Sequence, residues 1–426
     1  MKKILSRIRR YLEKLRYFNR ARLINRIRLL IDIKQINIKP RSFPIKVTLS
    51  LSNVCNYACP MCSINNLRKS KFKKVINNIS LVQLKSFSAL FKFVEQLSFV
   101  GFVGESVLNP EFIPIVKYLK SRFQMYLFIS SNGYGILDDI QDVMVETGFD
   151  SVIFSIHAAT PETYRILQGS HLEVVLSNVE NLQRKKHKKG VSKPYITIVY
   201  ALNKANIKET TIMIDLAHKL NIERLHLYHY HDYGLSELSL ESNVEYANKM
   251  LDEIYDYAKQ KNIGYLLPKT PPYYEEYSFK ESQDEKEIPC YLPWTGLQLR
   301  SSYSHSNSLY LGCCNVYNAF LFDYDKHISY YGKVDIIKIW HHPLFQYLRK
   351  TVNTNKKHKK NPLCQYCKSK KRNYLKSTDN KKNYEIKLLV LDEFIDGFKA
   401  NYINEIEEVI GLKVLYTEDD ELRALA

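Results

Sequence analysis

Three cysteines lie close together at Cys55, Cys59 and Cys62, in the spacing C-x3-C-x2-C. The residues just before them, 45–51, are rich in β-branched side chains and alternate in polarity, which predicts a strand followed by a tight cysteine-bearing loop. Zinc and iron–sulfur sites are commonly completed by four thiolates. Three thiolates leave one coordination position open, and an open position is where a metal site can carry out chemistry.

A second group of cysteines lies in the C-terminal half of the chain, at Cys290, Cys313, Cys314, Cys364 and Cys367. Residues 296–300 and 309–311 between them predict two strands joined by a polar turn. Four thiols from one compact unit are enough to close a metal site. A zinc ribbon is an alternative, because C-x2-C pairs such as Cys364 and Cys367 serve zinc equally well.

Strand-like and helix-like stretches alternate between residues 45 and 266. The pattern predicts a parallel sheet with helices outside it, an α/β fold, in which ligands bind at the C-terminal ends of the strands. The predicted strands are 45–51, 97–103, 125–130, 151–157, 195–200 and 224–229, with helical stretches over 81–94, 207–220 and 244–261. The loops after the strands carry Gly104, Glu105 and Asn132, and Ser155 and His157 end the fourth strand.

The cysteine motif after a first strand resembles the signature of the radical S-adenosylmethionine (radical SAM) superfamily. The resemblance implies a partial (β/α)6 TIM-like barrel and a [4Fe-4S] cluster held by Cys55, Cys59 and Cys62. In that family SAM chelates the fourth iron. One electron, from a reductase or a flavodoxin- or ferredoxin-type donor, cleaves SAM to a 5′-deoxyadenosyl radical that abstracts hydrogen from the substrate.

The resemblance also implies contacts to SAM. The segment from Gly104 to Pro110 is similar to the family's G-E-P-L-L-N-P motif, whose backbone and carboxylate receive the SAM amino group. The sequence departs from relatives where His157 stands for an aspartate near the SAM ribose and where Gln168-Gly169 stands for Arg-x-Gly. The expected SAM-binding residues are Tyr57, Gly104, Glu105, Asn132, Ser155 and His157.

The second cysteine group resembles the short "twitch" form of the SPASM domain. This resemblance implies one auxiliary [4Fe-4S] cluster held by Cys290, Cys313, Cys364 and Cys367, with Cys314 as the alternative to Cys313. The expected organisation is a basic helical segment (1–42), the radical SAM barrel (43–267), a connector (268–287), the SPASM/twitch domain (288–370), and a linker with a small β-α-β extension (371–426).

The formal net charge is +19, which suggests an anionic partner such as nucleic acid, a phosphorylated substrate or a membrane surface, or reflects composition alone. Within residues 1–42, Leu and Ile recur at helical spacing among many Arg residues. Such a helix either lies on an anionic membrane or docks on its own barrel with a solvated basic face. No apolar run is long enough to span a bilayer and no secretory signal is evident. We therefore expect a cytoplasmic protein, with possible peripheral contact at the inner membrane face through residues 1–40.

The resemblance implies an oxidoreductase-type radical SAM enzyme. The segment before the barrel is shorter than the peptide-recognition domain of many relatives, which favours oxidation or epimerisation of a small or lipid-linked molecule, such as a sugar or an alcohol. A peptide-modifying (RiPP-type) maturase is the alternative within the family. A zinc-stabilised nucleic-acid-binding protein is the alternative of another class, but the finger-type Cys/His pattern that would support nucleic-acid binding is missing.

Overall fold

The computed structural model describes residues 19–62, 76–100, 104–169, 171–230, 236–261, 265–266, 290–301, 308–312, 320–323, 334–353, 415–416 and 422–423. Cys313, Cys314, Cys364 and Cys367 lie outside these residues, as do the connector 268–287 and most of the C-terminal extension.

A ten-stranded sheet forms the centre of the molecule, in the order β10-β9-β8-β1-β2-β3-β4-β5-β6-β7. Strands β1 to β7 follow one another in sequence and are all parallel, as the alternating pattern predicts. Their bounds are β1 (Lys46–Ser50), β2 (Gln96–Val100), β3 (Tyr126–Ser131), β4 (Ser151–Ser155), β5 (Tyr195–Leu202), β6 (Arg224–His229) and β7 (Tyr265–Leu266). The six strands expected from the sequence are confirmed, and β7 adds a short seventh.

The predicted C-terminal hairpin is also present, and it joins the same sheet. Strand β8 (Gly296–Ser301) pairs parallel with β1, and β9 (Ser308–Gly312) and β10 (Phe320–Asp323) continue antiparallel from it. A separate two-stranded ribbon consists of β11 (Leu415–Tyr416) and β12 (Leu422–Arg423).

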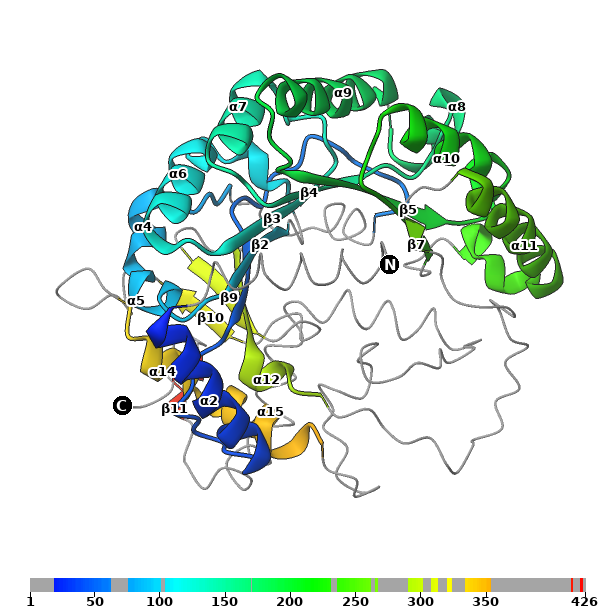
Figure 1. The fold of residues 1–426 in the computed structure, drawn as a ribbon. Coiled ribbons are helices and arrows are strands. Elements are labelled where there is room, and N and C mark those ends of the chain that lie inside the picture. Colours follow the sequence, from blue (N-terminus) through cyan, green and yellow to red (C-terminus); the bar gives the residue numbers. More distant parts are fainter. Residues whose placement is uncertain are drawn as a thin grey trace.

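Helices cover the convex face of the curved sheet, as Figure 1 shows. They are α4 (Leu81–Ser86), α5 (Ser88–Phe91), α6 (Phe112–Phe123), α7 (Asp138–Glu146), α8 (Pro161–Leu167), α9 (Leu172–Lys188), α10 (Thr210–Lys219) and α11 (Val244–Lys261). Short 3₁₀ turns lie at Ser106–Leu108, Ile207–Glu209, Ser236–Leu238 and Leu240–Ser242. Helix α8 begins as its sequence indicates, because the Thr160 side chain accepts from Thr163 N–H and Pro161 occupies the first turn.

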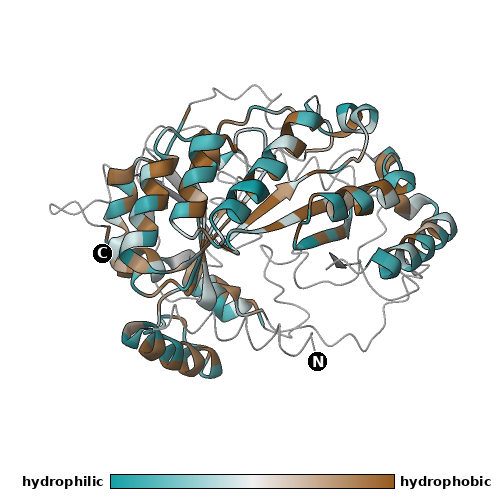
Figure 2. Ribbon diagram, turned by 45° about the horizontal axis from the view of Figure 1, so that its top comes forward, coloured by the Kyte–Doolittle hydropathy of each residue, from teal (hydrophilic) through white to brown (hydrophobic). Residues whose placement is uncertain are grey.

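The core lies between the sheet and these helices. Strand residues that face the helices, such as Leu97, Leu127, Val152 and Ile198, are fully buried. The alternate strand residues are mostly half-buried and lie on the concave face. Hydrophobic residues accordingly concentrate on the strands and on the inward sides of the helices (Figure 2).

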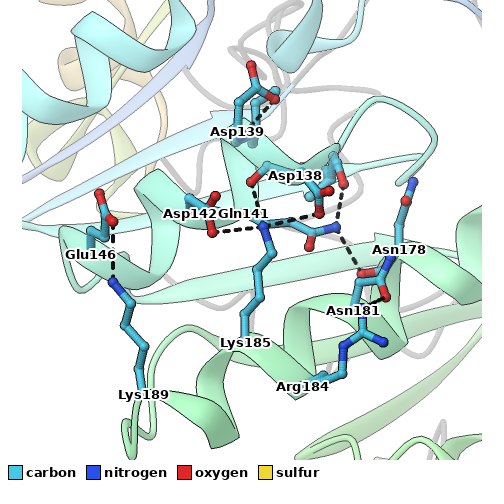
Figure 3. Close-up of polar contacts among 12 residues, drawn as sticks. Asp138, Asp139, Gln141, Asp142, Glu146, Asn178, Asn181, Arg184, Lys185 and Lys189 are labelled. Atoms are coloured by element: carbon cyan, nitrogen blue, oxygen red, sulfur yellow. Dashed lines mark hydrogen bonds and ion pairs between the residues drawn. The ribbon is translucent and has the colours of Figure 1, made fainter.

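Helices α7 and α9 are joined by exposed ion pairs and by hydrogen bonds from the buried side-chain amide of Gln141 (Figure 3). Lys185 Nζ lies 2.7 Å from Asp142 Oδ1, and Lys189 Nζ lies 3.2 Å from Glu146 Oε1. Such exposed pairs contribute little to stability. The buried Gln141 instead donates to the carbonyl of Ile136 at 2.8 Å, which fixes the start of α7 beside the loop after β3.

The N-terminal part of the described chain packs on the C-terminal elements α12 (Leu292–Thr295), α14 (Ile336–Trp340) and α15 (Pro343–Thr351). The buried Arg349 guanidinium donates to the carbonyls of Pro293, Ile38 and Trp340 at 2.8–3.0 Å. The indole N–H of Trp340 donates to Ser42 O at 2.8 Å. Burial lowers the pKa of Arg349 to about 9, so the side chain stays charged at neutral pH. This contact between residues 38–42 and residues 293–349 is not apparent from the sequence.

None of the helices in the described residues combines the length and the apolar character needed to cross a membrane.

Candidate active site

The loop that carries the three cysteines follows β1 and is held on both sides by backbone hydrogen bonds. Ile79 N–H donates to Leu51 O at 2.9 Å, and Glu105 N–H donates to Val54 O at 2.6 Å. Within the loop, Cys62 N–H donates to Cys59 O at 3.0 Å, which places these two cysteines on one turn. Cys55, Cys59 and Cys62 form no disulfide in the described part of the chain, and all three are half-buried.

The three thiols share one short loop and are not gathered at a single point. Among the described residues no three Cys, His, Asp or Glu side chains converge closely enough to hold one metal ion. Thiolates that each bind a different iron of a cluster do not have to meet at one point. The Cys55 sulfur accepts hydrogen bonds from Tyr57 N–H at 3.5 Å and from the Asn132 side-chain amide at 3.8 Å. Such bonds stabilise negative charge on sulfur and tune a cluster's potential.

Gly104 allows the loop after β2 to pack directly against the cysteine loop. A Cβ at this position would lie 2.7 Å from Val54 O and closer still to Ser52 O, both of which are backbone atoms. Only glycine permits this approach. Gly104 therefore sets the distance between the cysteine loop and the neighbouring Glu105.

Glu105 is a buried carboxylate with one oxygen in use. Its Oε2 accepts from Asn132 N–H at 2.9 Å, whereas Oε1 has no hydrogen-bond partner in the described part of the chain. Burial raises the pKa of Glu105 to about 7, against the opposing effect of hydrogen bonds from Asn132, Ser131 and Val107. An ammonium group placed against Oε1 would satisfy this oxygen and restore the ordinary charge of the carboxylate.

The turn after β3 brings Asn132 between the cysteine loop and Glu105. Its side-chain amide donates to Asn56 Oδ1 at 2.9 Å as well as to the Cys55 sulfur. Gly133 has φ +83°, a conformation that favours glycine. From α9, the Asn178 amide donates to Gly133 O at 2.9 Å and so fixes this turn from behind. The sequence did not predict this role of Asn178, because nothing local identifies the carbonyl that its amide reaches.

Tyr57 supports the cysteine loop. Its ring is 7% exposed and packs against Tyr134 and Tyr164 at centroid distances of 5.8 and 6.4 Å. The Tyr164 hydroxyl donates to the Tyr57 hydroxyl at 3.4 Å. The Tyr57 side chain therefore packs in the core beneath the cysteine loop.

The end of β4 is organised by Gln168, one of the residues at which the sequence departs from relatives. Its side-chain oxygen accepts from His157 N–H at 2.6 Å, and its amide donates to Ser155 O at 2.9 Å. His157 lies two residues beyond the end of β4, where its Nδ1 accepts from Ala201 N–H at 3.1 Å. Burial lowers the pKa of His157 to about 4. At neutral pH the ring is therefore uncharged, with its hydrogen on Nε2.

This half-buried neutral imidazole predicts a pH effect on stability. The pKa of His157 is about 4 in the folded chain against 6.5 in the unfolded chain, so between these values the unfolded state binds more protons. The parent should therefore lose stability, relative to His157→Gln, as the pH falls from 6.5 to 4, by about 2 kcal/mol. Denaturant titrations of both proteins across this range would measure the difference. Parallel pH profiles would contradict the half-buried neutral ring.

Cys290 is the one predicted auxiliary ligand within the described residues. It is half-buried and packs with Ile45 and Trp294, and it exchanges hydrogen bonds with the Asn353 side chain at 2.8 and 3.1 Å. This position is near the N-terminal end of β1, whereas the three-cysteine loop follows its C-terminal end. The two sites are thus separated by a five-residue strand, about 16 Å long.

Comparison with known proteins identifies the domain that holds the site. A model described as "Radical SAM superfamily" matches residues 49–230, the segment that holds the three-cysteine loop, Glu105, Asn132 and His157. Residues 49–230 form a radical SAM domain. The [4Fe-4S] cluster and SAM expected from the cysteine motif are accordingly the cofactors of this protein.

Individual proteins resemble the chain at low sequence identity. A "Probable GTP 3′,8-cyclase" of Saccharolobus islandicus is 23% identical over 270 residues, which cover 63% of this chain and 77% of the relative. The crystal structure of Streptococcus suis SuiB bound to S-adenosylmethionine aligns with a TM-score of 0.54 and 15% identity over 78% of this chain and 74% of SuiB. SuiB bound to its precursor peptide SuiA aligns with a TM-score of 0.50 and 13% identity over 78% and 72%. These structures share the fold.

Proposed function

We propose that this radical SAM enzyme oxidises or epimerises a small or lipid-linked hydroxylated molecule, such as a sugar or an alcohol. In this proposal Cys55, Cys59 and Cys62 hold the cluster, and SAM binds against Glu105. The observation that carries the site assignment is the buried Glu105 carboxylate, whose Oε1 lacks a partner among the described residues while Oε2 is tied to the turn beside Cys55. When bound, the cluster and SAM supply a 5′-deoxyadenosyl radical that abstracts a hydrogen atom.

The chain's own residues would orient SAM in this arrangement. Glu105 offers its free oxygen to the SAM amino group, because an ammonium there would pair the buried carboxylate. The neutral His157 offers Nε2–H as a donor to a hydroxyl group of the ribose. Ser155 is half-buried near His157 at the end of β4. Asn132 links Cys55 to Glu105, because its side-chain amide donates to the Cys55 sulfur and its backbone N–H donates to Glu105.

The side chains on the concave face of β6 favour the proposal of a hydroxylated substrate. Arg224, His226 and Tyr228 alternate along this strand on the half-buried side. The Tyr228 ring lies 5.9 Å from the ring of His226 and 6.3 Å from that of His157. An aromatic face flanked by hydrogen-bonding groups is a combination that suits a sugar or another polyhydroxylated molecule. Burial and Arg224 lower the pKa of His226, which favours its neutral form as a donor and acceptor.

Peptide modification is the second candidate. The structural likeness to SuiB, which was crystallised with its precursor peptide SuiA, is the observation that favours it. GTP is a further probe suggested by the names of the Saccharolobus relatives. Zinc-dependent nucleic-acid binding has no support from the family match.

An auxiliary [4Fe-4S] cluster held by Cys290, Cys313, Cys364 and Cys367 is part of the proposal. A substrate that has lost a hydrogen atom must lose one more electron and a proton to complete a two-electron oxidation, and this cluster would accept the electron. Four thiolate ligands leave no open iron, so the auxiliary cluster would not bind SAM.

The Cys364→Ala variant tests this assignment. After anaerobic reconstitution and reduction with dithionite, it should lose about half of its iron and all product, yet still form 5′-deoxyadenosine, because each cluster has its own ligands. Iron content, 5′-deoxyadenosine and product would be measured with candidate sugars, alcohols, peptides and GTP.

Cys314→Ala is the matched control, and we expect it to retain its iron. Parental iron content or turnover in Cys364→Ala would contradict the auxiliary cluster. Iron loss in Cys314→Ala but not in Cys313→Ala would mean that Cys314, and not Cys313, is the fourth ligand of the auxiliary cluster. Product from a peptide alone would replace the proposed substrate class.

A further inference from the structure

Helix α2 (Arg20–Lys34) carries a row of exposed aliphatic side chains on a folded, docked helix. Leu30 is 69% exposed and Ile27 is 52% exposed, which is unusual for large apolar residues in regular structure. The helix lies at the periphery of the molecule, near α14 and α15 (Figure 1). We define the outer face of α2 as Leu23, Ile24, Ile27, Leu30 and Ile31.

The opposite face of α2 is buried and combines the core residue Leu29 with three polar side chains. The Arg22 guanidinium donates to Phe123 O at 2.7 Å, and the Asn25 side chain exchanges hydrogen bonds with the backbone of Phe43 at 2.8 and 2.9 Å. Asp32 accepts from Ser42 N–H at 2.8 Å. These bonds fix the rotation of the helix, because turning it would leave buried polar groups without partners. The outer face is therefore held toward solvent by the fold.

Basic side chains surround the outer face. At 100° per residue, Arg26 and Arg28 flank the apolar arc on its two sides, and Arg20 and Lys34 lie at the two ends of the helix. Arg26 also pairs with Glu95 across the helix contact. Asp32 is the single acidic residue of α2, and it is buried on the other side. The exposed surface of α2 is thus apolar and cationic, without negative charge.

We infer that the outer face of α2 docks the enzyme on an anionic lipid surface. An apolar arc of Leu and Ile bordered by Arg and Lys matches a helix that lies in the plane of the interface, with its aliphatic side chains among the acyl chains and its cations among the headgroups. A protein interface would favour aromatic side chains at its centre, and the outer face has none. The polar docking contacts leave the whole arc available to the lipid.

Vesicle flotation with the full-length protein tests this inference. The probes are vesicles of phosphatidylcholine alone and of phosphatidylcholine mixed with phosphatidylglycerol. The parent should bind the mixed vesicles and lose binding as salt is raised. Ile27→Gln/Leu30→Gln should bind about tenfold more weakly, because it removes two of the inserted side chains. Arg28→Gln/Lys34→Gln should bind more weakly at low salt and respond less to salt.

Val82→Gln/Ile212→Gln is the matched control. It also replaces two exposed aliphatic side chains, 77% and 46% exposed, on the helices α4 and α10. It should bind vesicles like the parent. If Ile27→Gln/Leu30→Gln bound the vesicles as tightly as the parent, the inference would be overturned. This holds even if deletion of residues 1–18 abolished binding, because the membrane contact would then lie in that segment and not in α2. Salt-independent binding of the parent to neutral vesicles would also overturn the inference. So would a parent that binds no vesicles and whose oligomeric state changes in Ile27→Gln/Leu30→Gln.

Discussion

The Cys59→Ala variant is expected to form no 5′-deoxyadenosine above background, at least about a hundredfold below the parent, because only three thiolates are available to the catalytic cluster. Cys59 lies on the turn closed by the Cys62 N–H bond and packs against the core, so alanine fits the space without disturbing the loop. Reconstitution under anaerobic conditions, reduction with dithionite and chromatography of the nucleoside products would measure the effect.

Pro60→Ala is the matched control for Cys59→Ala. Pro60 is the exposed neighbour of Cys59 in the same loop, so its replacement keeps all three thiols. It should retain most of the SAM cleavage. Substantial 5′-deoxyadenosine from Cys59→Ala would show that the catalytic cluster is held elsewhere.

The barrel could be predicted from the sequence because its elements obey local rules. Buried parallel strands such as Ile196 to Leu202 read as continuous apolar runs, and helices such as α11 show a regular apolar stripe. The pairing of β8 with β1 could not be predicted. Periodicity identifies a strand but not its partner, and here the partners lie about 250 residues apart.

The candidate site was predictable in part for the same reason. The three cysteines, Gly104 and Glu105 lie in short segments with a recognisable spacing. Gln168 and Asn178 act through side-chain hydrogen bonds to backbone groups, Gln168 on residues 11 and 13 positions away and Asn178 on a turn 45 positions away. No local pattern reports such a bond, because its partner depends on how the helices pack on the sheet.

Helix α2 shows a further limit. The spacing of Leu and Ile correctly indicates an amphipathic helix over 20–34, but the usual expectation places the apolar face against the protein. Helix α2 is docked on the protein, as one of the two alternatives expects, but its solvent-facing side carries aliphatic as well as basic side chains. Here Arg22, Asn25 and Asp32 are buried, because backbone groups of Phe123, Phe43 and Ser42 satisfy them. Those partners could not be known from the helix sequence.

Gly104→Ala is expected to have the second large effect, on stability and on SAM binding together. The added Cβ would meet the backbone of Ser52, Asn53 and Val54. Backbone cannot rotate away as a flexible side chain can, so the loops must separate, at a cost of about 3 kcal/mol. Separation would break the 2.6 Å bond from Glu105 N–H to Val54 O and carry the Glu105 carboxylate away from Cys55.

Gly296→Ala provides the comparison that isolates this clash. Gly296 also lies beside β1, but a Cβ there would find its nearest neighbour at 3.7 Å, an ordinary contact, and its φ of −132° suits any residue. Thermal unfolding and SAM-binding calorimetry of both reconstituted variants would be compared. Gly104→Ala should unfold several degrees below Gly296→Ala and bind SAM at least about tenfold more weakly, since both effects follow from one displaced loop. A stable Gly104→Ala with parental SAM affinity would mean that the contact between the two loops does not set the geometry of the site.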